Sequence, residues 1–328
     1  MTIYDIAKEA GVSASTVSRV INNKPGVRKE TKKKIQQLLA KYNYSPNEAA
    51  RGLVTQASKI IGILVDDIRT IHHTDGAYII ERELVKLGYC CIIFNTGTDE
   101  ASKANYINIL KRRRVEGAVL IGSSFQVKAV EQAIKKYLSD TPIVMANGYL
   151  DLPNVYGILA DEQNGVANCV KLLFDKGYRR PAFVIDLHTP SNLAKKAGFE
   201  QAVQSLAPGE EILVYETERT LQGGYKVTQK IVRERPDVDG IIYAVDLLAA
   251  AGTRALIDMA ISIPEQVAVI GIDNSIYAEI CNPKLTSLDN KLLNLSMTAA
   301  HNLISALNGK QPNKKILIFS SIEERETT

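Results

Sequence analysis

The start of the chain carries two short amphipathic patterns on either side of a glycine. Apolar side chains at 3, 6, 7 and 10 keep the i, i+3, i+4, i+7 spacing of a helix face, and those at 17, 20 and 21 also share a face. Thr2 and Ser13 stand where N-caps are needed, and Gly11 ends the first pattern. The second helix fits the major groove of DNA by its N-terminal end, although an ordinary packing hairpin has the same pattern.

Two further stretches extend this pair of helices. Apolar residues at 35, 38, 39 and 42 share one face and predict a third helix, which completes a minimal core. Residues 47–54 are long enough for about two turns of helix, too few to be stable alone in water. Leu53 beside Arg51 in that stretch suits insertion into the minor groove, and a plain linker is the alternative.

Charge is divided unevenly along the chain. Residues 1–58 contain ten Lys or Arg and four Asp or Glu, a net charge of +6, whereas the whole chain carries +4. Residues 59–328 therefore carry −2. A basic head on a nearly neutral body favours a polyanion as the partner of the head, because each neutralised phosphate releases counterions.

From residue 60 onward, short apolar runs alternate with helical patterns. The runs form two series, at 60–65, 90–94, 117–122 and 142–147, and then at 182–186, 211–215, 240–245 and 267–273. Apolar strands that are each followed by a helix predict parallel, doubly wound sheets. Two series predict two lobes, with a cleft lined by the loops that follow the carboxyl ends of the strands.

Other features limit the function classes. The chain has no long apolar run and no apolar leader segment, so we expect a cytoplasmic protein without a membrane anchor. The cysteines at 90, 91, 169 and 281 lack metal spacing and are expected to be core thiols. Because GxGxxG, GxxxxGK[ST] and GxSxG are absent, we expect no cofactor and no catalytic residues. The alternatives are a solute-binding protein, or an enzyme that acts on a sugar or a nucleotide.

The segment TIYDIAKEAGVSASTVSRVINN, the basic helix and YSPNEAARGL together resemble the LacI/GalR family of bacterial transcription regulators. TIYD and PNxxARGL are most similar to its catabolite control protein A-like branch. The resemblance implies an α/β chain with a helix-turn-helix domain at 1–46, a hinge helix and linker at 47–58, and an effector-binding and dimerisation body at 59–328. That body is periplasmic-binding-protein-like, with doubly wound parallel sheets. Because the family chain crosses between lobes three times, the N-lobe is expected at about 59–158 and 290–318, and the C-lobe at about 159–289.

The resemblance also implies a DNA-contacting set. Ala14 and Ser15 fall where the family reads base edges, Arg19 falls on its base-reading arginine, and Leu53 falls on its intercalating leucine. Because Ala14 offers only a methyl group, we expect readout to depend on Ser15, Arg19 and the bend at Leu53. The expected set is Thr2, Tyr4, Ser13, Ala14, Ser15, Thr16, Ser18, Arg19, Asn22, Tyr44, Asn47, Ala50, Arg51 and Leu53.

Effector contacts follow from the same resemblance. His72 and His73 replace the aromatic residues common in that loop, Lys195 replaces an arginine, and Arg219 stands where an aromatic often stacks on the ligand. Asp246 has a second interpretation as the N-cap of its helix. The expected set is Arg69, His72, His73, Ser123, Asn147, Ser191, Lys195, Arg219, Asp246 and Asp273. Because bases outnumber acids in it, our hypothesis is a polar, anionic effector such as a sugar phosphate, rather than a neutral sugar held between aromatic rings.

The implied function is a sequence-specific regulator of carbohydrate or central metabolism genes, with repression expected from the family. It would bind a pseudo-palindromic double-stranded DNA operator as a homodimer, and an effector of the sugar or sugar phosphate class would control that binding. Whether a phosphocarrier protein also binds is left open. The polar tail at 320–328 lacks heptads, so we expect no tetramerisation coil.

Overall fold

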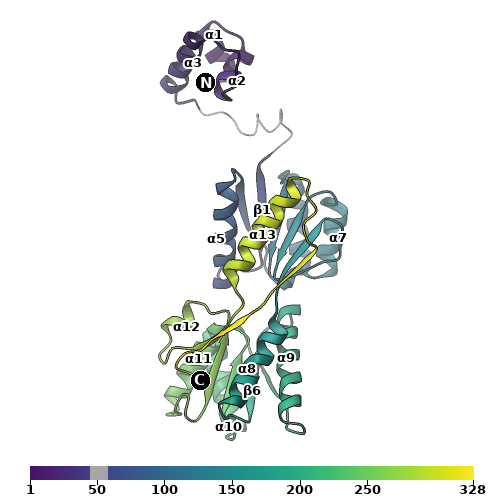
Figure 1. The fold of residues 1–328 in the computed structure, drawn as a ribbon, viewed down its shortest axis with the longest axis vertical. Helices are drawn as coiled ribbons and strands as arrows, with labels where there is room; N and C mark the ends of the chain where they lie inside the picture. Colours follow the sequence, from purple (N-terminus) through teal and green to yellow (C-terminus); the bar gives the residue numbers. More distant parts are fainter. Residues whose placement is uncertain (45–57) are drawn as a thin grey trace. The chain divides into compact units, whose positions relative to one another are not determined.

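The structure is a computed structural model of the chain in which residues 1–44 and 58–328 are described. The chain divides into two compact units, Met1–Lys59 and Ile60–Thr328, drawn in Figure 1. The predicted hinge at 47–54 lies outside the described residues.

The described part of the first unit contains the helices α1 (Ile3–Ala10), α2 (Ala14–Ile21) and α3 (Lys29–Lys41). Thr2 and Asp5 form a capping box at the start of α1, in which the Thr2 backbone N–H donates to Asp5 Oδ2 at 2.7 Å. Gly11 has a φ of +71°, a left-handed conformation that costs glycine little and turns the chain into α2. The apolar positions of the sequence pattern meet in one core around the fully buried Ile6, Val17 and Ile35.

The second unit contains two six-stranded sheets, and each sheet is the centre of one lobe (Figure 1). The N-lobe sheet has the order β11-β5-β4-β3-β1-β2 and only parallel pairs. Its strands are β1 (Ile60–Val65), β2 (Cys90–Asn95), β3 (Gly117–Ile121), β4 (Ile143–Ala146), β5 (Val155–Ala160) and β11 (Lys315–Ile318). One face packs on α5 (Ile71–Lys86) and α13 (Leu292–Leu307), and the other on α6 (Glu100–Arg112) and α7 (Lys128–Tyr137).

The C-lobe sheet has the order β12-β10-β9-β8-β6-β7. Its strands are β6 (Pro181–Ile185), β7 (Leu213–Glu216), β8 (Gly240–Tyr243), β9 (Ala268–Ile272), β10 (Thr286–Asp289) and β12 (Ser321–Glu323). Helices α8 (Glu162–Asp175) and α9 (Pro190–Leu206) cover one face, and α10 (Leu221–Glu234) and α11 (Asp246–Asp258) cover the other. A short helix, α12 (Ile276–Ile280), follows β9. The predicted doubly wound architecture is confirmed in both lobes.

The chain passes between the lobes after β5, after β10 and after β11, which gives three crossings. Two details differ from the sequence prediction. Strand β5 continues to Ala160, so the expected lobe boundary at 158/159 falls inside a strand. The tail is also part of the C-lobe, because β12 pairs antiparallel with β10 and the Val269 backbone N–H donates to the Thr327 carbonyl oxygen at 2.9 Å.

The cysteines are free, and their burial is uneven. Cys169 is a core thiol, whereas Cys90 is exposed on β2, which is an edge strand of its sheet. The expectation of a core thiol is therefore wrong for Cys90, because an edge strand leaves one side of its backbone uncovered. Within the described ranges, no helix has both the length and the apolar character that a membrane crossing requires.

Candidate functional site

The first candidate surface is the polar face of α2. Ser13 caps this helix by accepting the Thr16 backbone N–H at 3.3 Å, and its hydroxyl lies 2.8 Å from that of Ser15. Val17 and Val20 bury the opposite face. Ser15 and Arg19 are exposed. A rigid helix with hydroxyl and guanidinium groups on its open face is the arrangement that reads base edges in a major groove.

The expected DNA-contacting residues are distributed over this unit as follows. Those that are exposed are Thr2, Tyr4, Ser13, Ser15, Arg19 and Asn22. Those that are half-buried are Ala14, Thr16, Ser18 and Tyr44. Those that lie outside the described residues are Asn47, Ala50, Arg51 and Leu53. Tyr4 has an exposed fraction of 73%, which is high for an aromatic side chain and leaves it available for contact.

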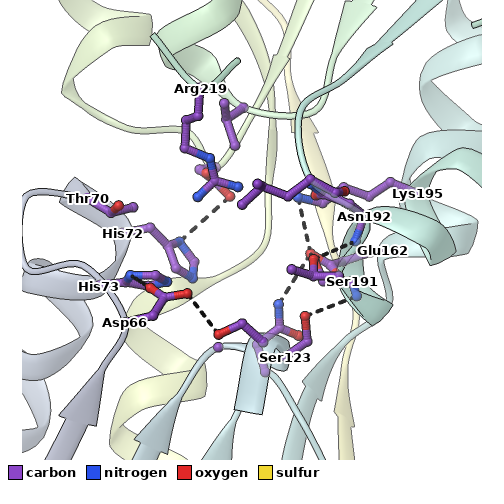
Figure 2. A pocket seen from close by; sticks show the side chains of 17 residues that line it. Asp66, Thr70, His72, His73, Ser123, Glu162, Ser191, Asn192, Lys195 and Arg219 are labelled. Carbon is purple, nitrogen blue, oxygen red and sulfur yellow. Dashed lines mark hydrogen bonds and ion pairs between the residues drawn. The ribbon is translucent and has the colours of Figure 1, made fainter. Parts of the chain in front are cut away.

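The second candidate site is a pocket between the lobes (Figure 2). The N-lobe lines it with the segments that follow β1, β3 and β4, and the C-lobe lines it with the starts of α8 and α9 and the segments after β7, β8 and β9. The pocket thus lies at the carboxyl ends of parallel strands, where this fold class binds ligands. Eight of the ten expected effector residues line it: His72, His73, Ser123, Asn147, Ser191, Lys195, Arg219 and Asp273.

On the N-lobe side, His73 is paired with Asp66. His73 Nδ1 lies 2.9 Å from Asp66 Oδ1, and the Ser124 hydroxyl donates to Asp66 Oδ2 at 2.8 Å. Burial alone would raise the pKa of Asp66, but the hydrogen bond and charge of His73, together with Ser124, hold it well below its usual range. Asp66 is therefore a fixed carboxylate in the wall of the pocket.

On the C-lobe side, Lys195 and Glu162 form a buried ion pair, with exposed fractions of 5% and 4% for their side chains. Lys195 Nζ lies 3.4 Å from Glu162 Oε1 and also donates to the Ala244 carbonyl oxygen at 3.1 Å. The same Oε1 accepts the Ser191 hydroxyl at 2.7 Å and the Asn147 side-chain amide at 3.3 Å. Because Asn147 belongs to the N-lobe, Glu162 ties the two lobes together.

A second ion pair joins Arg219 to Asp186 behind the pocket wall. The Asn192 side-chain amide donates to Asp186 Oδ1 at 2.6 Å. Burial would raise the pKa of Asp186, but the charge and hydrogen bond of Arg219 lower it. The guanidinium of Arg219 therefore enters the pocket already neutralised.

His72 and Asp273 face each other from opposite lobes, with 3.6 Å between His72 Nδ1 and Asp273 Oδ1. That distance is too long for a hydrogen bond, and His72 Nδ1 is buried without a partner in the described structure. Burial lowers the pKa of His72. Asp273 has a φ of +108°, which is rare for a residue with a side chain and marks a strained position.

Two expected effector residues do not reach the pocket. Arg69 is exposed and pairs with Asp67 at 2.7 Å. Asp246 is buried, and its carboxylate accepts the Ser275 backbone N–H at 2.6 Å and the Ser287 hydroxyl at 2.6 Å. Burial and the nearby charge of Asp273 raise the pKa of Asp246 to about 7. The N-cap interpretation of Asp246 is also wrong, because Val245 occupies the N-cap position.

Comparisons with known proteins agree with this arrangement. Residues 2–47 match the family model for bacterial regulatory proteins, lacI family, and residues 170–328 match the periplasmic binding protein-like domain. An HTH-type transcriptional regulator from Lachnoclostridium phytofermentans is 32% identical over 331 residues, which cover 100% of this chain and 99% of that protein. This chain belongs to the LacI family.

The LacI-family assignment extends to the branch that the sequence indicated. Catabolite control protein A from Priestia megaterium is 28% identical over 332 residues, which cover 100% of this chain and 99% of that protein. A crystal structure of the lac repressor dimer bound to operator and the anti-inducer ONPF has the same fold, with a TM-score of 0.90 at 22% identity, covering 100% of this chain and 98% of that one. The predicted family and fold class are confirmed, and the chain is a DNA-binding transcriptional regulator.

The sequence interpretation missed three acids that shape the pocket of this LacI-family chain: Asp66, Glu162 and Asp186. Asp66 directly follows β1 and Asp186 directly follows β6, so the strand-end rule was a signal for both. Glu162 had no such signal, because the strand before it was not recognised. These acids correct the expected charge balance: Lys195, Arg219 and His73 each face a carboxylate, and the predicted excess of positive charge is wrong.

Proposed function

We propose that this regulator binds operator DNA as a homodimer through α2 and the segment at 47–58. We further propose that a neutral, polyhydroxylated small molecule of the sugar class occupies the inter-lobe pocket and changes its affinity for the operator. The observation that carries the second part is the pairing of opposite charges within the pocket wall.

A neutral effector follows from that pairing. Asp66, Glu162 and Asp186 already pair with His73, Lys195 and Arg219, as Figure 2 shows for the pairs at the pocket wall. A phosphate group would have to displace one of these carboxylates and would also meet Asp273. A hydroxyl group, in contrast, both donates and accepts, so it can bind a carboxylate and a cation of the same pair without separating their charges. The arrangement therefore favours hydroxyls over phosphate.

The lining also favours a ligand that is polar on both faces. The lining residues in the described part of the chain include no Phe, Tyr or Trp; their apolar side chains are Leu187 and Val245. A sugar ring that stacks an apolar face on an aromatic ring finds no such partner here. A small sugar or an open-chain polyol with hydroxyls on all sides fits this lining better.

Control of DNA binding requires that the ligand prefer one arrangement of the lobes. The Ser191 backbone N–H donates across the cleft to the Ser123 hydroxyl at 3.1 Å, and Asn147 reaches Glu162 at 3.3 Å. A polyol between these groups would bind both lobes at once and favour the closed arrangement. The coupling to the operator would pass through the segment at 47–58, which joins the body to the DNA-reading helices.

A thermal-shift panel tests the effector class. The panel pairs neutral sugars, such as D-ribose, D-xylose, D-glucose and cellobiose, with the phosphate monoesters of the monosaccharides. We expect a neutral sugar at a hundredfold excess over its Kd to raise the melting temperature of the body by roughly 5–10 °C. Stabilisation by the phosphate esters alone, or by no sugar of the panel, would contradict the proposal.

A further inference from the structure

A second cavity adjoins the inter-lobe pocket. This side cleft has a volume of about 410 Å³ and lies between α5 and the start of α13 in the N-lobe and the segment after β9 in the C-lobe. Its lining combines apolar side chains, which include Leu292 and Leu293, with polar ones, which include Asp75 and Lys291. A surface with apolar and hydrogen-bonding groups side by side suits a sugar ring, whose faces are less polar than its edge.

The side cleft and the inter-lobe pocket share two lining residues, His72 and Asp273. These side chains therefore form the partition between the two cavities, and Figure 2 shows His72 projecting into the inter-lobe pocket from the N-lobe side. The partition is weak: the 3.6 Å between Nδ1 and Oδ1 exceeds a hydrogen bond, and His72 Nδ1 has no partner in the described structure. Burial lowers the pKa of His72 and so disfavours the charged imidazole that an ion pair with Asp273 would need.

The two halves of the partition differ in how firmly they are held. Asp246 fixes the C-lobe half, because its carboxylate binds the Ser275 backbone N–H at 2.6 Å and the Ser275 hydroxyl at 2.9 Å, two residues after Asp273. The strained φ of Asp273 persists under that restraint. His72 stands in the first turn of α5, and its rotation about the side-chain bonds needs no movement of the backbone. His72 Nδ1, which has no hydrogen-bond partner in the described structure, and Asp273 Oδ1 can therefore both bind a ligand group that lies between the two cavities.

We propose that the side cleft is a second sugar subsite and that the effector is a two-unit saccharide. One unit occupies the inter-lobe pocket, the other lies against Leu292 and Leu293, and the atoms that link them take the space that the His72 side chain leaves when it rotates away from Asp273. This inference rests on the proposed function, because it extends the same effector site. A hydroxyl next to the glycosidic bond donates its one hydrogen to Asp273 and accepts from His72 Nδ1 in the tautomer that carries a hydrogen on that nitrogen.

The test compares D-glucose, D-xylose and D-ribose with cellobiose, xylobiose and maltose, by thermal shift and calorimetry on the full chain. Leu293→Trp fills the side cleft without touching the inter-lobe pocket. Leu87→Trp is the matched control, because Leu87 is a leucine of similar exposure (50% against 56%) on the same lobe and lines neither cavity. We expect a disaccharide to stabilise the wild type and Leu87→Trp alike, and to lose about tenfold or more in affinity in Leu293→Trp, about 1.4 kcal/mol or more.

Any other outcome refutes the proposal of a second sugar subsite in the side cleft. Binding of monosaccharides alone would mean that the side cleft takes no sugar, and equal binding of a disaccharide by Leu293→Trp and Leu87→Trp would mean that it lies elsewhere. If no sugar of either size binds, the proposed effector class fails and the subsite fails with it. If Leu293→Trp melts below the wild type in the absence of sugar, Leu293→Phe, which fills less of the cleft, replaces it. Leu293→Phe must then lower the affinity for the disaccharide and leave the affinity for a monosaccharide unchanged.

Discussion

Replacement of Lys195 by methionine tests the central ion pair of the pocket. Methionine keeps most of the volume of the side chain and removes its charge, so Glu162 is left buried at 4% exposure without its cation. Removal of one partner of a buried ion pair costs about 3–5 kcal/mol. The Ser191 hydroxyl and the Asn147 amide still donate to Glu162, which places our expectation at the lower end of that range.

The assay is the thermal and urea unfolding of the body, followed by circular dichroism because the chain has no tryptophan. At about 2–4 °C per kcal/mol for a unit of this size, Lys195→Met should lower the melting temperature by roughly 6–12 °C. Glu162→Gln in the same chain should restore most of the loss, because it removes the uncompensated charge. Two results would refute this account of the ion pair. One is a free energy of unfolding for Lys195→Met within 1 kcal/mol of the wild type, and the other is a double variant with Glu162→Gln that is no more stable than Lys195→Met.

Three further predictions follow from other sites. Because the pKa of Asp246 is raised to about 7 in the folded chain, against an ordinary value of 3.8, the wild type should lose stability as pH rises from about 4 to about 7. Asp246→Asn should lack this loss, so its melting temperature should rise relative to that of the wild type between pH 5 and pH 8. A difference in melting temperature that stays constant over this pH range would contradict the prediction. Arg19→Ala should weaken operator binding by about 1–3 kcal/mol and relax the base preference at one base pair, whereas Lys33→Ala should leave the base preference unchanged. Binding to operators that differ by a single base measures this preference, and an unchanged preference in both variants would exclude Arg19 from base reading. Thr2→Ala removes the side-chain half of the capping box and should lower the free energy of unfolding of the first unit by about 0.5–2 kcal/mol. Thr31→Ala on α3 is the control, because Thr31 caps no helix, and it should lower that free energy by less. Equal losses in the two variants would contradict the role of the cap.

The sequence predicted most of the fold because most elements are long and strongly patterned. Strands such as β1 and β3 are continuous apolar runs, and their burial on both faces leaves little ambiguity. Four strands were missed, β5, β10, β11 and β12, and three of them have weaker patterns: β5 contains Gly157, β11 alternates between exposed and half-buried residues, and β12 has three residues. Their pairing is set by partners far away in the chain, such as Lys315 opposite Gly157, which no local pattern records.

The site was predicted less completely, because its chemistry depends on which side chains meet. The resemblance to the family located His72, Lys195 and Asp273 in the pocket lining, but the ion pairs join residues from different segments. Glu162 and Lys195 lie on different helices, and Arg219 reaches Asp186 across 33 positions of sequence. A count of bases and acids along the sequence therefore gave the wrong charge balance, since it missed the acid that neutralises each base.

The affinity for operator DNA, measured with and without sugar, tests most directly whether a sugar effector controls DNA binding. DNA is selected by the full chain from a random pool, and its affinity is then measured by fluorescence anisotropy at two salt concentrations. We expect a palindromic site whose affinity falls steeply with salt and changes by about fivefold or more when the neutral sugar that stabilises the body is added. Binding that is independent of salt, or an operator affinity that the stabilising sugar leaves unchanged, would contradict the account.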